Sequence, residues 1–437
     1  DSFREGPAGQ GGTSYWPGGI WSGDSVERLD ASIKTGALVA MIFASPAGAD
    51  DPITKKPGYH IEHFRIRPSL SITQQYDDNV FTTERHTRSD WITVATPSIK
   101  IDSTWAEHSL QFHAGAESAT YWEYDDEDYL DYWAGGEGRY HVNDATDLFA
   151  GLGARYEHEG RDVPDSAMGQ LEPTTYRVFN ADAGIRTRYR DTGLRMGGTY
   201  EKLDFDNAPA VSGRIINDDR DRELLGAGMR ATHDLNEQQQ VFLQLRYDER
   251  NYDMRRDQLG FERSSQGYRA ALGLMQGWDD SNRLEAYVGI ISQSYEDSRF
   301  DDVRKLDFGG RLTLVLARGN QITMRLQRSL DETTEPGSPG YINTSISGRL
   351  EHRSSPRLTP YLNLGYSDYD FLETGRSDKT YSAGAGLKYF VTRNTHIVLG
   401  ASHRSRDSND KGRTLGSNDF DQTSVFLNLT TRLYPLR

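Results

Sequence analysis

Residues 241–250 read Val-Phe-Leu-Gln-Leu-Arg-Tyr-Asp-Glu-Arg, and this stretch decides the fold. Every second position is apolar or aromatic, at Val241, Leu243, Leu245 and Tyr247. The positions between them carry polar or charged side chains, at Gln244, Arg246, Asp248 and Arg250. Successive side chains point to opposite faces of a β-strand, so a period of two predicts a strand with one apolar and one polar face.

The same period continues from about residue 61 to the end of the chain, and helical spacing is not sustained anywhere. The predicted strands cover residues 61–76, 90–102, 108–122, 131–142, 146–157, 174–190, 193–205, 221–233, 239–251, 265–278, 283–296, 304–317, 321–331, 341–353, 358–370, 379–391, 395–406 and 421–433. We therefore expect an all-β protein of about 18 strands, with 16 as the alternative.

The connections between these strands alternate in length. Asn143-Asp144-Ala145 and Arg318-Gly319-Asn320 are short turns, whereas 158–173 and 206–220 are long and polar. Transmembrane barrels have an even number of antiparallel strands, short periplasmic turns and longer outer loops. Because each short turn follows an even-numbered strand, the sequence predicts a transmembrane antiparallel up-and-down β-barrel in the outer membrane of a Gram-negative cell, with both termini in the periplasm.

The composition agrees with a barrel. Hydrophobic residues make up only 35% of the 437 residues, and no stretch reaches the ~18 consecutive apolar residues of a membrane helix. A barrel strand gives half of its residues to a polar interior, so the whole chain can be hydrophilic. Aromatic residues at strand ends fit interfacial girdles, although cross-strand pairs in a soluble sheet would also explain them; they are Tyr121, Trp122, Tyr124, Tyr129, Tyr132, Trp133, Tyr366, Tyr369, Phe371, Tyr389 and Phe390.

The first 49 residues differ from the rest. Lys34 precedes the apolar run 37–44, and Ser45-Pro46-Ala47-Gly48-Ala49 follows with small residues at the positions that a cleavage site needs. We expect 1–49 to be an upstream segment and a signal peptide that is cleaved near Ala49. Residues 50–60 then form a periplasmic segment, and 61–437 form the barrel.

Charge and motif content exclude several functions. The chain carries 65 acidic and 50 basic residues, a formal net charge of −15, which argues against non-specific nucleic-acid binding. It has no cysteine and no G-x-S-x-G, H-E-x-x-H, P-loop or EF-hand motif, so we predict no catalysis, no metal and no cofactor. Acidic runs such as Asp125-Asp126-Glu127-Asp128 favour solvated outer loops over cation sites shared with lipopolysaccharide. Outer-membrane lipid and lipopolysaccharide are the expected partners.

A recognisable sequence motif lies at the start of the barrel. Tyr76-Asp77-Asp78-Asn79-Val80-Phe81 follows Pro68-Ser69-Leu70-Ser71-Ile72 and is itself followed by Ser89-Asp90 and Pro97-Ser98-Ile99. This sequence motif resembles that of the putative β-barrel porin type 2 family. Because members of that family are often linked to exopolysaccharide or capsule production, the resemblance implies a conduit that passes polysaccharide together with periplasmic export components. The Asp and Asn side chains of the turn can bond local backbone amides, which favours a loop anchor over a ligand site.

The polar strand faces carry the candidate pore-lining residues. These are Arg186, Arg188 and Arg190 on one strand, Arg246, Asp248 and Arg250 on another, and Arg325, Gln327 and Glu117 elsewhere. Mixed charge with Tyr, Gln and Asn suits a wet channel, in which charged side chains set selectivity. The first functional hypothesis is polysaccharide export through the outer membrane. A small-solute or sugar diffusion porin and a closed structural or adhesive barrel are the alternatives.

Overall fold

The computed structural model describes residues 58–164, 170–211, 213–316, 319–333, 335–410 and 418–434. The predicted signal segment, residues 1–49, lies outside these described residues, as do the residues of 50–60 that precede Gly58. The prediction of signal cleavage therefore stays a prediction.

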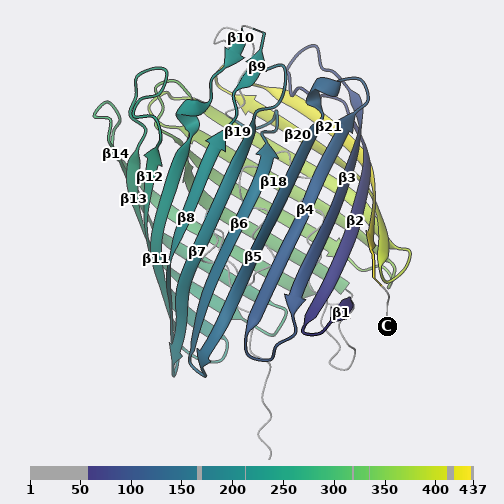
Figure 1. The fold of residues 1–437 in the computed structure, drawn as a ribbon, viewed down its shortest axis with the longest axis vertical. Coiled ribbons are helices and arrows are strands. Elements are labelled where there is room, and N and C mark those ends of the chain that lie inside the picture. The colour runs from purple at the N-terminus through teal and green to yellow at the C-terminus, as the bar shows by residue number, and fades with distance from the viewer. Residues whose placement is uncertain are drawn as a thin grey trace, which may run out of the picture.

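Eighteen antiparallel strands form one closed barrel (Figure 1). They are β2 (Phe64–Asp77), β3 (Asp90–Ser103), β4 (Ser109–Tyr121), β5 (Tyr129–Asn143), β6 (Thr146–His158), β7 (Thr175–Tyr189), β8 (Thr192–Phe205), β11 (Arg222–Asp234), β12 (Gln239–Tyr252), β13 (Ser265–Gly277), β14 (Arg283–Tyr295), β15 (Val303–Leu316), β16 (Asn320–Asp331), β17 (Tyr341–His352), β18 (Leu358–Phe371), β19 (Ser377–Phe390), β20 (Thr395–Ser408) and β21 (Phe420–Arg432). Each strand pairs with its neighbours in the chain, and β21 pairs with β2 to close the barrel. The predicted fold class and strand number are confirmed.

Long loops gather at the upper rim in Figure 1, and short turns lie at the lower rim, where β21 ends at Arg432. The longest connections lie between β6 and β7 and between β8 and β11. Short periplasmic turns and long outer loops are the rule for these barrels, so the lower rim is the periplasmic one.

Small elements outside the barrel strands were not predicted. They are β1 (Tyr59–Ile61), which pairs with β2, the hairpin of β9 (Ala208–Ala210) and β10 (Gly213–Ile215), and the 3₁₀ turns η3 (Asp125–Glu127) and η4 (Asp218–Arg220). Each has three residues, too few to show a period. Among the residues that the structure describes, no helix is long and apolar enough to cross a membrane.

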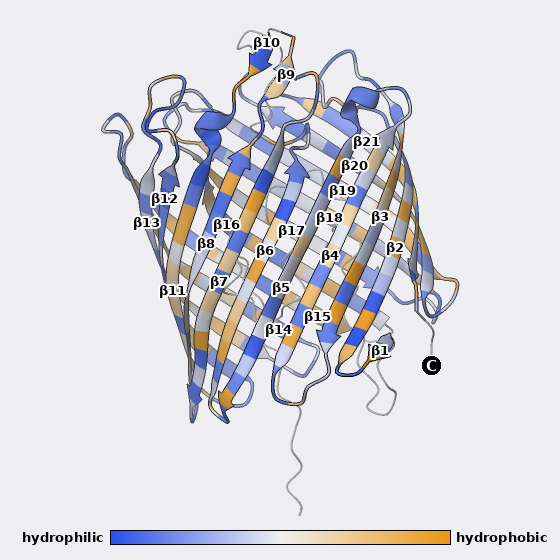
Figure 2. Cartoon of the chain, in the orientation of Figure 1, coloured by the Kyte–Doolittle hydropathy of each residue, from blue (hydrophilic) through white to orange (hydrophobic). Residues whose placement is uncertain are grey.

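The two faces of the barrel differ as the alternation predicts. Leu243, Leu245 and Leu272 are exposed on the outer face, whereas Gln244, Asp248 and Arg269 are buried on the inner face. Residues directly opposite each other on antiparallel strands share a face, so the register assigns every strand residue to one side. Figure 2 shows the resulting alternation of hydrophilic and hydrophobic positions along the strands.

Only some of the aromatic residues at the strand ends face outward, as the expected girdle requires. Trp122 is 65% exposed and Tyr132 is 50% exposed, as girdle residues would be. Tyr121 and Tyr129, however, pack against a buried cluster around Val80. Strand-end aromatics in this barrel therefore serve both the membrane side and the interior.

Candidate functional site

The inward face of β12 carries three of the predicted pore-lining residues. Asp248 accepts a hydrogen bond from Nε of Arg250 at 3.3 Å, and Arg250 also donates to the carbonyl oxygen of Leu330 at 3.2 Å and pairs with Glu332. Arg246 lies deeper in the barrel, directly opposite Arg269 of β13. The structure therefore places all three inside and ties Arg250 to the loop after β16.

The arginines predicted on β7 do not form one row. Arg186 donates to Asp147 of β6 at 2.7 Å, and Arg188 pairs with Asp234 of β11. Arg190 lies beyond the end of β7 at Tyr189, in the turn to β8. There it has a positive φ of 52°, and its guanidinium lies over the ring of Tyr189. Arg190 thus belongs to the periplasmic turn because β7 ends one residue before it.

The remaining candidates lie far apart. Arg325 on β16 directly opposes Arg311 of β15, and Gln327 is the next inward position of the same strand. Glu117 on β4 accepts hydrogen bonds from the Tyr129 hydroxyl at 3.0 Å and from Thr96. Since β4 and β16 are separated by many strands in either direction around the barrel, Glu117 and Arg325 line different parts of the wall.

Sequence reasoning missed the arginines that complete the inner wall. Arg186, Arg195 and Arg230 are consecutive cross-strand neighbours on β7, β8 and β11. Arg246 opposes Arg269, and Arg311 opposes Arg325. Alternation alone gives the face of each arginine, but only the strand register shows that they are paired.

The inner wall from β7 to β16 is basic. Its inward-facing basic residues are Arg186, Arg188, Arg195, Arg222, Arg230, Arg246, Arg250, Arg269, Arg283, Lys305, Arg311 and Arg325. Its inward-facing acidic residues are Asp182, Glu201, Asp234, Asp248, Glu285, Asp307 and Asp331. Basic side chains therefore outnumber acidic ones on this part of the wall, which we call the basic wall, although the whole chain is acidic.

The loop between β6 and β7 folds into the outer mouth. The Asp162 carboxylate pairs with Arg404 of β20, and its carbonyl oxygen accepts a hydrogen bond from Arg406. The carbonyl oxygen of Pro164 accepts a hydrogen bond from Arg376 at 2.9 Å. Between β6 and β20 the barrel wall runs through β5, β4, β3, β2 and β21, so this loop spans part of the opening. We call these three contacts the mouth latch.

Further contacts hold the same loop at its base. Arg161 donates to Glu127 at 2.9 Å, and its carbonyl oxygen accepts from the hydroxyl of Thr82. Arg220 of η4 donates to Glu159 at 2.9 Å. The loop is thus fixed by charged groups from three other outer loops as well as by the barrel wall.

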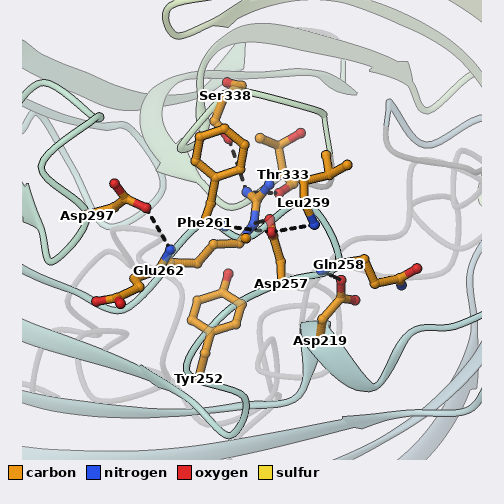
Figure 3. Close-up of polar contacts among 12 residues, drawn as sticks. Asp219, Tyr252, Asp257, Gln258, Leu259, Phe261, Glu262, Asp297, Thr333 and Ser338 are labelled. Atoms are coloured by element: carbon orange, nitrogen blue, oxygen red, sulfur yellow. Dashed lines mark hydrogen bonds and ion pairs between the residues drawn. The ribbon is translucent and has the colours of Figure 1, made fainter.

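A second cluster joins two other outer loops (Figure 3). Nη1 of Arg263 donates to the carbonyl oxygens of Thr333 at 2.7 Å and Ser338 at 3.0 Å, and its Nε donates to Asp257 at 2.8 Å. Asp257 also accepts from the backbone N–H groups of Leu259 and Phe261. This buried arginine therefore connects the loop between β12 and β13 to the loop between β16 and β17.

The turn after β2 makes hydrogen bonds to β21, the strand that closes the barrel against β2. Asp77 accepts the backbone N–H of Asn79 at 2.9 Å, and the side-chain amide of Asn79 donates to the carbonyl oxygen of Asp421 at 2.8 Å. Asp78 accepts the backbone N–H of Thr423. These contacts join the first barrel strand to the last one at the outer rim.

The hydrophobic end of the same turn points inward. Val80 packs with Ile92 and Ala119, and the ring of Phe81 lies 5.1 Å from that of Tyr124. Tyr76 instead contacts Trp91 on the outer face. The contacts made by residues 76–81 are structural, which agrees with a loop anchor.

No site for metal chemistry is visible in the described part of the chain, where no group of three or more His, Asp or Glu side chains could hold an ion. The interior carries guanidinium and carboxylate groups fixed on the barrel wall, beneath a mouth that loops narrow.

A closed barrel with an apolar outer face and a charged interior defines the class of outer-membrane porin-type barrels. The chain belongs to the family described as putative beta-barrel porin 2, whose model matches residues 51–433. It is a protein of the Gram-negative outer membrane.

The chain is similar at low sequence identity to solved structures of Pseudomonas aeruginosa proteins. OpdK of Pseudomonas aeruginosa is 15% identical with a TM-score of 0.45, over 84% of this chain and 98% of that one. OpdO of the same organism is 14% identical with a TM-score of 0.45, over 86% and 98%. OccK2 (OpdF) of P. aeruginosa, solved in complex with glucuronate, is 13% identical with a TM-score of 0.46, over 84% and 98%. No curated protein has a sequence that matches this chain.

Proposed function

We propose that this protein is a passive channel through which small polar solutes diffuse across the outer membrane. The observation that carries the proposal is the mouth latch, which holds a loop across part of the opening of a barrel with a charged interior. A charged interior lets hydrated solutes pass, and a loop fixed across the mouth limits their size. No covalent step is involved, and porins as a family are not enzymes.

This proposal replaces polysaccharide export as the first hypothesis. Export rested on the family resemblance alone and receives no support from the comparisons. The mouth latch argues against it physically, because a polymer would have to displace Asp162 and Pro164 from Arg404, Arg406 and Arg376. The expected contacts with lipid and lipopolysaccharide remain part of the proposal, and the apolar outer face supports the first of them.

Liposome swelling with sugars of increasing size tests the proposal. Vesicles containing the folded protein should swell in arabinose, more slowly in raffinose and not in dextran, and protein-free vesicles are the control. Entry of dextran, or block of single-channel current by polysaccharide, would favour the export conduit. A heat-modifiable barrel that admits no sugar would favour the closed structural barrel.

A further inference from the structure

Arginines stand directly opposite one another on the basic wall. Arg195 lies between Arg186 and Arg230 in the register, and Arg311 lies opposite Arg325. Directly opposite residues have Cα atoms about 4.5–5.5 Å apart, and like charges at that spacing destabilise a sheet. Repeated pairs of opposed arginines therefore gather positive charge on one arc of the wall.

Several of these guanidinium groups lie against aromatic rings. Arg195 lies 4.4 Å from the ring centroid of Phe149, and Arg230 lies 3.7 Å from that of Phe242. A cation–π contact fixes a guanidinium without cancelling its charge. Acidic contacts also exist, such as that of Arg230 with Glu285 at 3.0 Å, but the basic residues exceed the acidic ones along this arc.

The other half of the wall is different, because its inward-facing basic residues are equal in number to its acidic ones. The basic residues are Arg65, Arg67, Lys100, Arg139, Arg155, Arg349, Lys388, Arg404, Arg406 and Arg432, and the acidic ones are Asp77, Asp90, Asp102, Glu117, Asp131, Glu137, Asp147, Glu157, Glu351 and Asp378. Arg65 and Arg67 share Asp102, at 3.3 and 2.6 Å. Arg349 pairs with Glu351 at 2.6 Å. Positive charge in excess is therefore concentrated between β7 and β16, where it faces the lumen.

Building on the proposed small-solute channel, we propose that the basic wall makes it selective for anions and that its preferred solutes carry carboxylate or phosphate groups. Excess fixed charge of one sign in a narrow lumen attracts ions of the opposite sign and excludes ions of its own sign. Guanidinium groups bind carboxylate and phosphate oxygens through paired N–H donors, and neighbouring arginines offer several such donors to one solute. Neutral sugars carry no charge for these arginines to attract.

Planar-bilayer recording of the whole folded protein in a KCl gradient tests the selectivity. We expect a reversal potential that corresponds to chloride permeability several-fold above that of potassium. The triple variant Arg195→Gln, Arg311→Gln, Arg325→Gln should lose most of this preference. The matched triple variant Arg195→Lys, Arg311→Lys, Arg325→Lys keeps the charge and should keep the preference, which separates charge from packing.

The solute class is tested in the same bilayers with citrate and pyrophosphate, one carrying carboxylates and the other phosphates. Either anion should reduce the chloride current of the unmodified channel at concentrations at which neutral raffinose does not, and the anion that does so more strongly names the preferred oxyanion. Clear current steps with no preference, or with a preference for potassium, would overturn the inference and leave the channel itself intact. A folded barrel without current steps would overturn both.

Discussion

Asp162 is the side chain whose change should most directly alter the channel mouth. Its carboxylate pairs with Arg404, and the side chains are only 5% and 12% exposed. Removing one partner of a buried pair costs about 3–5 kcal/mol, because the other charge stays buried without compensation. Asp162→Asn keeps the shape of the side chain and removes the charge. Since about 1.4 kcal/mol is a factor of ten, the equilibrium between latched and displaced loop should shift by roughly 100-fold or more.

Single-channel recording measures this shift. The Asp162→Asn channel should show a larger mean conductance and more frequent flicker, because the bonds from Arg406 and Arg376 to the loop backbone remain and recapture the loop. Asp302→Asn, the same substitution at an exposed position of another outer loop, is the matched control and should leave both quantities unchanged. If Asp162→Asn folds and its conductance and noise equal those of the unmodified protein, the loop does not set the width of the mouth.

Three further predictions concern the barrel itself. Asn79→Ala should lower stability by about 2–4 kcal/mol, because Asn79 is buried and its amide bonds both its own turn and the carbonyl oxygen of Asp421. The midpoint of heat-modifiability measures this loss, and Asn236→Ala, which removes only hydrogen bonds within an exposed turn, should lower the midpoint less. Burial, followed by the nearby Asp204, Asp218 and Asp253, raises the pKa of Asp221 to about 6, so the folded protein should gain stability from this group as the pH falls from 6 towards 4. Carbon-13 titration of the carboxyl group checks this pKa, and a midpoint near the ordinary value of about 3.9 would contradict it. The Asp221→Asn variant should lack this pH-dependent gain in thermal stability. Leu272→Arg on the outer face of β13 should cost about 2–4 kcal/mol in lipid vesicles, because it puts a charge into the apolar belt; denaturant titration that shows no loss would mean that this face does not contact lipid.

The strands could be predicted almost residue by residue. The stretch 239–251 corresponds to β12 at Gln239–Tyr252, and 90–102 corresponds to β3 at Asp90–Ser103. A period of two sustained over a dozen residues is a strong signal, and polar turn residues mark its ends. Arg190 shows the limit: alternation continued one residue past the end of β7, and only the backbone shows that the turn has begun.

The site could be predicted only in part, for two physical reasons. Alternation gives the face of Arg246, but the pairing of Arg246 with Arg269 depends on register, which is set by turns and by the closure of the whole sheet. The mouth latch depends on contacts between residues more than two hundred positions apart, such as Arg376 with Pro164. No local pattern in a polar loop indicates whether it folds inward or outward.

The net charge of the whole chain differs in sign from the excess charge of the inner wall between β7 and β16. A formal charge of −15 would suggest a channel that attracts cations. In a barrel, however, the solute meets only the inward half of each strand and the loops at the mouth. The charge of exposed acidic residues elsewhere is screened by dissolved ions within about 10 Å at moderate salt. Glu223 and Asp204, for example, lie on the outward face of β11 and β8 by register, and they add to the net charge without facing the lumen. The fixed charge that a solute meets therefore has to be worked out from the register of the inner wall, where basic residues exceed acidic ones between β7 and β16 although the chain as a whole is acidic.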